Sequence, residues 1–118
     1  MAKVYAFDVD DTIEGLGGPV TIESMTHLRA TGHLVGLCGN WAAFCRVVES
    51  WWQIVSFMNV GVAKEVLLTH LKEHLPGHED YILVGNIPGV SGTSDDQGAA
   101  LRAGWRFIKE SDFAQGMR

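Results

Sequence analysis

Short apolar runs alternate with helix-like segments along the whole chain, and this alternation constrains the fold more than any other feature. Each run is short and rich in aliphatic or aromatic residues, as buried strands are. The segments between them carry helix caps or apolar residues at helical spacing. The predicted strands are 3–7, 34–38, 54–57, 81–84 and 105–108. Strands that alternate with helices favour an α/β fold, with a parallel sheet covered by helices on both faces.

Capping residues, glycine and proline set the predicted helix boundaries. Thr21 is expected to cap a helix over 22–30, and Asn40 a longer helix over 41–53. Two further helices are predicted over 63–75 and 97–103, and the residues after 108 are expected to form a polar tail. Right-handed crossovers place the first strand near the middle, which predicts a Rossmann-like sheet of order 3-2-1-4-5.

Length and charge narrow the class of protein. The 118 residues suit one domain over 1–118, and the net charge of −5 argues against nucleic-acid binding. No apolar run is long enough to span a membrane. Cys38 and Cys45 have the spacing of neither a zinc site nor a disulfide framework. We therefore expect reduced thiols in a cytoplasmic protein.

Acidic side chains follow the first predicted strand in the run FDVDDT, where Asp8 and Asp10 are two positions apart. Both carboxyl groups can turn toward one pocket, because the strand gives way to a loop at this point. A carboxylate nucleophile needs a metal ion to offset its repulsion from a phosphoryl group. A second carboxyl group can protonate the leaving group and then activate water. The spacing therefore indicates phosphoryl transfer.

The segment FDVDDT resembles the first motif of the haloacid-dehalogenase-like superfamily, whose pattern is DxDx[TV]. The resemblance implies that Asp8 is the nucleophile, that Asp10 is the general acid and base, and that Mg²⁺ is the cofactor. It also implies a phosphatase that hydrolyses a phosphate monoester through an aspartyl-phosphate intermediate. Dehalogenases of the superfamily lack the second acid, so Asp10 favours the phosphohydrolases.

Later motifs of the superfamily have counterparts in order along nearly the whole chain. Cys38 stands where a serine or threonine usually binds the phosphoryl group, and the N–H groups of Gly39 and Asn40 are expected to help bind it. Lys64 fits the lysine that balances the charge of the aspartyl phosphate. The resemblance thus implies Asp8, Asp10 and Lys64 as catalytic residues and residues 38–40 as the phosphate site.

The last motif is an acidic pair after a later strand. Asn86 stands where its first acid is usual, and Asp95 and Asp96 follow ten residues downstream. The implied metal ligands are Asp8, Asp10, Asp96, Asn86 and Asp95. The register to Gly104 favours Asp96 over Asp95 for the metal and makes Asp95 a helix cap.

The spacing between motifs leaves no room for a cap domain. One loop and one helix fill the stretch from Asp8 to Cys38, and one helix and a short strand fill the stretch from Cys38 to Lys64. A capless site is open, so the phosphorylated substrate can be a small molecule or a macromolecule. The departures at Cys38 and Asn86 keep a second hypothesis in view, a weak or inactive binding or regulatory protein on the same fold. A receiver domain is disfavoured, because the third strand is followed by Asn59 rather than an aspartate.

Two further groups of residues are candidates for an interface and for metal binding. Trp51 and Trp52 are candidates for a homodimer contact, since tryptophan is enriched at interfaces. His70 and His74 are four positions apart on a predicted helix, but we expect solvated side chains because no third ligand accompanies them.

Overall fold

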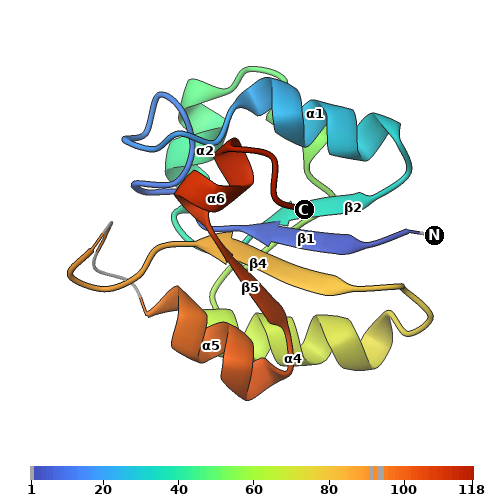
Figure 1. Ribbon diagram of the computed structural model, residues 1–118. Coiled ribbons are helices and arrows are strands. Elements are labelled where there is room, and N and C mark those ends of the chain that lie inside the picture. The colour runs from blue at the N-terminus through green and yellow to red at the C-terminus, as the bar shows by residue number, and fades with distance from the viewer. Residues whose placement is uncertain (1, 91, 93–94) are drawn as a thin grey trace.

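The computed structural model describes residues 2–90, 92 and 95–118 and contains one five-stranded parallel sheet (Figure 1). The strands lie in the order β3-β2-β1-β4-β5, and every neighbouring pair is parallel. Their bounds are β1 Val4–Phe7, β2 Leu34–Leu37, β3 Phe57–Met58, β4 Tyr81–Gly85 and β5 Arg106–Lys109. The predicted fold class and strand order are confirmed.

Helices cover both faces of the sheet. The helices are α1 Ile22–Ala30, α2 Trp41–Val47, α3 Trp51–Ile54, α4 Lys64–His74, α5 Asp96–Ala103 and α6 Glu110–Ala114. Figure 1 shows α1 and α6 on one face and α4 with α5 on the other. Thr21 caps α1 as predicted, because its side chain accepts a hydrogen bond from the Ser24 N–H at 3.1 Å. Gly104 ends α5 with φ of 76°, a conformation that favours glycine.

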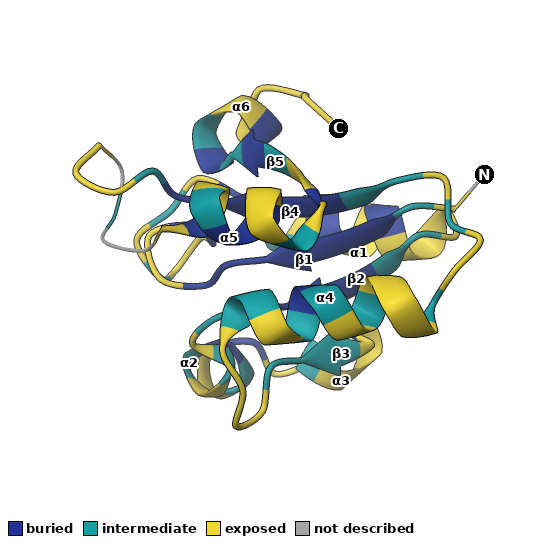
Figure 2. Ribbon diagram, turned by 90° about the horizontal axis from the view of Figure 1, so that it is seen from below, coloured by how far each residue is buried: buried dark blue, intermediate teal, exposed yellow. Residues whose placement is uncertain are grey.

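The core divides into two clusters, because successive side chains of a strand point to opposite faces. Tyr5 and Phe7 of β1 lie in the cluster under α1, α2 and α6, whereas Val4 and Ala6 lie in the cluster under α4 and α5. Phe113 of α6 packs edge-on against Phe7, with ring centroids 5.2 Å apart. Burial on both sides makes the sheet the most buried layer of the molecule (Figure 2).

Three predictions of local structure are wrong. The single helix over 41–53 is divided into α2 and α3, because Val48 takes an extended conformation and packs into the core. The third strand begins at Phe57 rather than at Ile54, which ends α3. The tail contains α6, where one buried aromatic residue, Phe113, anchors a segment of otherwise polar character.

The described chain from β1 to α4 contains only α1, β2, α2, α3 and β3, in agreement with the predicted absence of an inserted cap. Among the described residues, no helix has the length and apolar character that crossing a membrane requires.

Candidate active site

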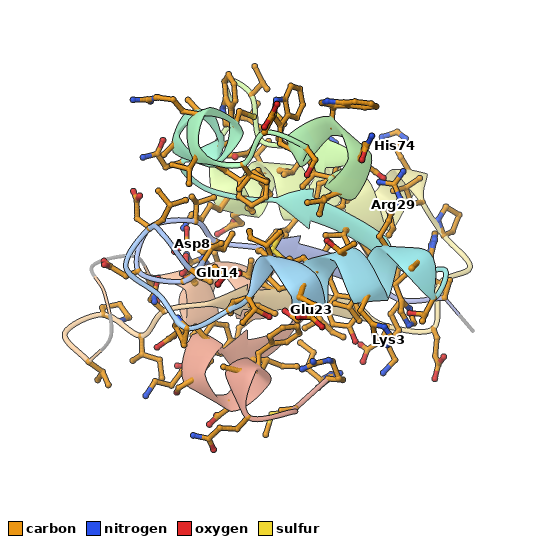
Figure 3. All side chains as sticks on the ribbon, turned by 90° about the horizontal axis from the view of Figure 1, so that it is seen from above. Lys3, Asp8, Glu14, Glu23, Arg29 and His74 are labelled. Carbon is orange, nitrogen blue, oxygen red and sulfur yellow. The ribbon has the colours of Figure 1, made fainter. Side chains whose placement is uncertain are left out.

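Asp8 lies directly after β1, at the carboxyl end of the central strand (Figure 3). Its N–H donates to the carbonyl of Val84 at 2.9 Å, which continues the pairing between β1 and β4. The residue is only 3% exposed. The sheet therefore fixes this carboxylate at the edge where ligands bind in open α/β folds.

Lys64 joins Asp8 to Asp96. Its Nζ donates to Asp8 Oδ1 at 2.8 Å and to Asp96 Oδ1 at 2.5 Å. Lys64 is the first residue of α4 and Asp96 the first of α5, so the packing of these two helices against the sheet brings the three side chains together. Asp96 is fully buried, and the Lys64 side chain is 21% exposed. A lysine is thus held between two buried carboxylates.

The electrostatics of this cluster reflect burial and mutual charge. Burial raises the pKa of Asp8 to about 6, Lys64 opposes that shift, and the Asp96 carboxylate adds to it. Burial would lower the pKa of Lys64, but the charge and hydrogen bonds of Asp8 and Asp96 raise it above its usual value. Lys64 is therefore charged, and Asp8 is mostly ionised near pH 7.

Asn86 ties the end of β4 to the loop after β1. Its backbone N–H donates to Asp96 Oδ2 at 2.7 Å, and its Nδ2 donates to the carbonyl of Asp11 at 2.9 Å. The hydroxyl of Thr12 lies 3.0 Å from Asn86 Oδ1 and 3.4 Å from Asp8 Oδ2. Asp11 has φ of 58°, which turns the chain back toward the sheet. Both oxygens of Asp96 already accept hydrogen bonds, from Lys64 and from Asn86.

The predicted phosphate site lies beside Asp8, but two of its groups have other partners. The fully buried Cys38 thiol donates weakly to the carbonyl of Lys64, with 3.9 Å between sulfur and oxygen, and burial raises its pKa to about 12. The N–H of Gly39 donates to Asn59 Oδ1 at 2.9 Å. Sequence reasoning missed this role of Asn59, although a polar residue just after a strand was a usable signal.

Two glycines make room for the buried carboxylates. A Cβ on Gly39 would lie 2.4 Å from Asp8 Oδ1, and one on Gly85 would lie 2.4 Å from Asp96 Oδ2. Neither distance is compatible with a real side chain. The acids can therefore occupy their positions only because residues 39 and 85 have no side chain.

Asp10 forms the exposed part of the cluster. Both of its carboxylate oxygens accept hydrogen bonds from Asn40 Nδ2, at 3.2 and 3.3 Å. Asn40 also caps α2, since its Oδ1 accepts from the N–H of Ala43 at 3.4 Å. Because Gly39 contacts Asp8 and Asn40 binds Asp10, one segment brings the two acids to the same edge. No enclosed pocket is found within residues 2–90, 92 and 95–118.

Asp95 lies apart from the buried cluster. It is exposed and caps α5, as the sequence predicts, by accepting a hydrogen bond from the N–H of Gly98 at 3.1 Å. Its Oδ2 also lies 3.8 Å from Arg102 Nη1. The two consecutive acids therefore differ in burial and in partners.

The remaining candidates lie elsewhere. Trp51 packs partly against the core and Trp52 is 63% exposed, and the homodimer contact stays a prediction. His70 and His74 are exposed, as expected for solvated side chains, but Glu73 lies beside them as a third possible ligand, which sequence reasoning missed. The acid directly before His74 was a usable signal.

Neither the protein-family models, nor the curated proteins, nor the solved structures compared with this chain match it. The functional interpretation therefore depends on the residues of the site and their arrangement in the fold.

Proposed function

We propose that the chain is a Mg²⁺-dependent phosphatase of the haloacid-dehalogenase-like type, which hydrolyses a phosphate monoester through an aspartyl phosphate on Asp8. One observation carries the proposal. Asp8 is buried at the carboxyl end of the central strand, and Lys64 Nζ contacts it at 2.8 Å. A buried carboxylate with a cation beside it suits a nucleophile that must accept further negative charge.

The two oxygens of Asp8 suit different tasks. Lys64 binds Oδ1, whereas Oδ2 has a longer contact of 3.4 Å with the Thr12 hydroxyl. We therefore assign the attack on phosphorus to Oδ2. The bond to the leaving oxygen breaks as the new bond forms, and Lys64 offsets the charge of the aspartyl phosphate.

Asp10 is the proposed proton carrier. It gives its proton to the leaving alcohol oxygen, and the resulting carboxylate then takes a proton from water. That water attacks the phosphorus, releases inorganic phosphate and regenerates Asp8. The exposed position of Asp10 supports this role, because both the leaving group and water must reach it.

The oxygen donors at this edge fit Mg²⁺, which prefers carboxylate and carbonyl ligands and keeps several waters. We propose the Asp8 carboxylate and the Asp10 backbone carbonyl as the main ligands, which leaves the Asp10 carboxyl group free to carry a proton. Asn86 Oδ1 is close by, since the Thr12 hydroxyl contacts both Asn86 and Asp8. Bound Mg²⁺ would supply positive charge to the phosphoryl oxygens. In this proposal Asp96 mainly binds and positions Lys64, and Asp95 caps α5. Their predicted roles as metal ligands therefore need separate tests.

A second candidate is a binding or regulatory protein with little or no turnover. Two contacts in the predicted phosphate site favour it. The Cys38 thiol donates to the backbone carbonyl of Lys64, and the Gly39 N–H donates to Asn59 Oδ1, so both donors are directed to protein groups. Asn86 also brings no charge to the metal. Such a protein would bind a phosphorylated ligand at the same edge without hydrolysing it.

Hydrolysis of an aryl phosphate separates the two candidates. We expect Mg²⁺-dependent release of phosphate that EDTA abolishes and that Asp8→Asn eliminates, because an amide is not a competent nucleophile. Asp11→Asn is the matched control, because Asp11 is a neighbouring exposed acid and asparagine tolerates its positive φ. If Asp8→Asn hydrolyses the substrate at the parent rate, the phosphatase assignment is wrong. A parent without turnover that binds orthovanadate, and loses this binding in Asp8→Asn, would instead support the binding protein.

A further inference from the structure

The last turn of α4 carries three metal-ligating side chains on one exposed face. His70, Glu73 and His74 each offer a ring nitrogen or a carboxylate oxygen, and these atoms lie within 4.8 Å of one another. The imidazole rings are stacked, with centroids 5.9 Å apart and an interplanar angle of 28°. Residues four apart share a helix face, so the backbone of α4 itself places the two rings side by side.

The three ligand atoms need to move only a short distance to coordinate one ion. Ligands about 2.0–2.1 Å from a tetrahedral zinc ion lie about 3.4 Å from one another. Since the three ligand atoms lie within 4.8 Å of one another, each pair must approach by no more than about 1.4 Å. All three side chains are exposed, so their torsions are free to make this adjustment.

The donor set selects the kind of cation. Two imidazoles and one carboxylate suit Zn²⁺, Cu²⁺ or Ni²⁺, whereas Mg²⁺ prefers oxygen ligands alone. The position also favours positive charge, because the carbonyl end of a helix carries partial negative charge. Lys72, in the same turn, directs its Nζ to the carbonyl of Gly104 at 2.6 Å, on the side of α5.

We propose that His70, Glu73 and His74 bind one divalent cation of the zinc group, with water completing the coordination. The site is separate from the Asp8 cluster. Lys64 begins α4 at that cluster, and residues 70–74 lie about 9 to 15 Å further along the helix axis. Figure 3 shows Asp8 and His74 toward opposite sides of the molecule. A bound ion would link two successive turns and so stabilise the end of α4.

Calorimetric titration of the metal-free full chain with zinc chloride, in the presence of excess Mg²⁺, tests the proposal. We expect one high-affinity Zn²⁺ per chain, because Mg²⁺ does not compete for imidazole nitrogen. His70→Ala and His74→Ala should each weaken binding by at least about tenfold, the cost of losing even a residue that supports a ligand. Glu73→Gln should weaken it less. Alanine favours the helix, so these variants should fold.

Two controls locate the ion. His27→Ala removes an exposed histidine from α1 and should leave the affinity unchanged, and Asp8→Asn should also leave it unchanged. Absence of Zn²⁺ binding by the parent would overturn the proposal. It would equally be overturned by full affinity in both His70→Ala and His74→Ala, or by an equal loss in His27→Ala. Because the outcome does not depend on Asp8, it is independent of the phosphatase proposal.

Discussion

The two halves of the Asp8 site differ in how their charges are held. In the buried half, Lys64 contacts both Asp8 and Asp96, and the backbone of Asn86 contacts Asp96. In the exposed half, Asp10 is bound by the neutral amide of Asn40. One half is a network of paired charges with little access to water, and the other is a single acid open to solvent.

This difference separates two tasks. Burying an ion pair costs desolvation energy, and apolar residues of similar size often make an equally stable core. The cluster of Asp8, Lys64 and Asp96 is therefore poorly explained by stability alone, and we interpret it as a fixed electrostatic environment for a reacting group. The exposed half suits exchange of protons and substrate.

Lys64→Met tests the buried half and should have the largest effect on stability. It leaves two carboxylates buried without their cation, so we expect a loss of about 3 kcal/mol in the free energy of unfolding at pH 7.5. Urea unfolding measures this quantity. The control is Lys72→Met on the same helix, whose exposed ammonium should contribute no more than about 1 kcal/mol. Equal losses in the two variants would show that the buried cluster of Asp8, Lys64 and Asp96 contributes no more to stability than an exposed lysine does.

Asp10→Asn tests the exposed half. Turnover of the aryl phosphate should fall by about 10²-fold, the usual contribution of a positioned acid and base. The fall should be larger for poorer leaving groups, while the free energy of unfolding should change by no more than about 0.5 kcal/mol. A loss that is the same for leaving groups of very different pKa would argue against proton transfer by Asp10.

The pair Asp96→Asn and Asp95→Asn compares a buried and an exposed acid at consecutive positions. Asp96→Asn places an amide N–H₂ against Lys64 or Asn86, and we expect it to cost about 2 kcal/mol of stability. Asp95→Asn should be nearly neutral, because asparagine caps helices as well as aspartate does. Urea unfolding measures the stabilities.

The same two variants test the metal roles of these acids. The sequence predicts that Asp96→Asn raises the Mg²⁺ concentration for half-maximal activity more than Asp95→Asn does. If Asp96 acts only on Lys64, turnover will fall while this concentration stays unchanged. A larger Mg²⁺ effect from Asp95→Asn would contradict both assignments.

The raised pKa of Asp8 predicts a pH dependence of stability in metal-free protein. Between its ordinary value of 3.8 and about 6, the folded chain binds more protons at Asp8 than the unfolded chain does. The free energy of unfolding should therefore fall as pH rises through this window, by about 1–2 kcal/mol. Urea unfolding in EDTA at pH 4.5 and 6.5 measures the change. In Asp8→Asn this part of the dependence should disappear, and an unchanged slope would contradict the shift.

The fold was largely predictable, because the alternation of strands and helices can be read from the local sequence and crossover handedness follows from the twist common to all strands. The prediction of one helix over 41–53 was wrong, because the spacing of Val48 is also compatible with a continuous helix. Only the packing of Val48 into the core explains why the helix ends there. The helix α6 was missed because one buried aromatic residue is too weak a pattern. In both places tertiary packing decided the local structure.

The site was predictable where residues carry a motif and less so where a contact depends on the backbone. The motif places Asp8 and Lys64 in order, and the fold brings them together. The position of Asn59 just after a strand marks it as a candidate, but no pattern indicates that its partner is the Gly39 N–H, or that the Asn86 N–H binds Asp96. Such contacts depend on where loops end in space, which spacing along a chain does not specify.

The absence of a side chain at Gly39 and Gly85 has a consequence for how this sequence can change over time. Each glycine is linked sterically to one acid, Gly39 to Asp8 and Gly85 to Asp96. A descendant chain can acquire a side chain at either position only after the corresponding acid has moved or been replaced. Position 39 should therefore vary together with position 8, and position 85 together with position 96. These two pairs would act as a record of whether a lineage has kept the site.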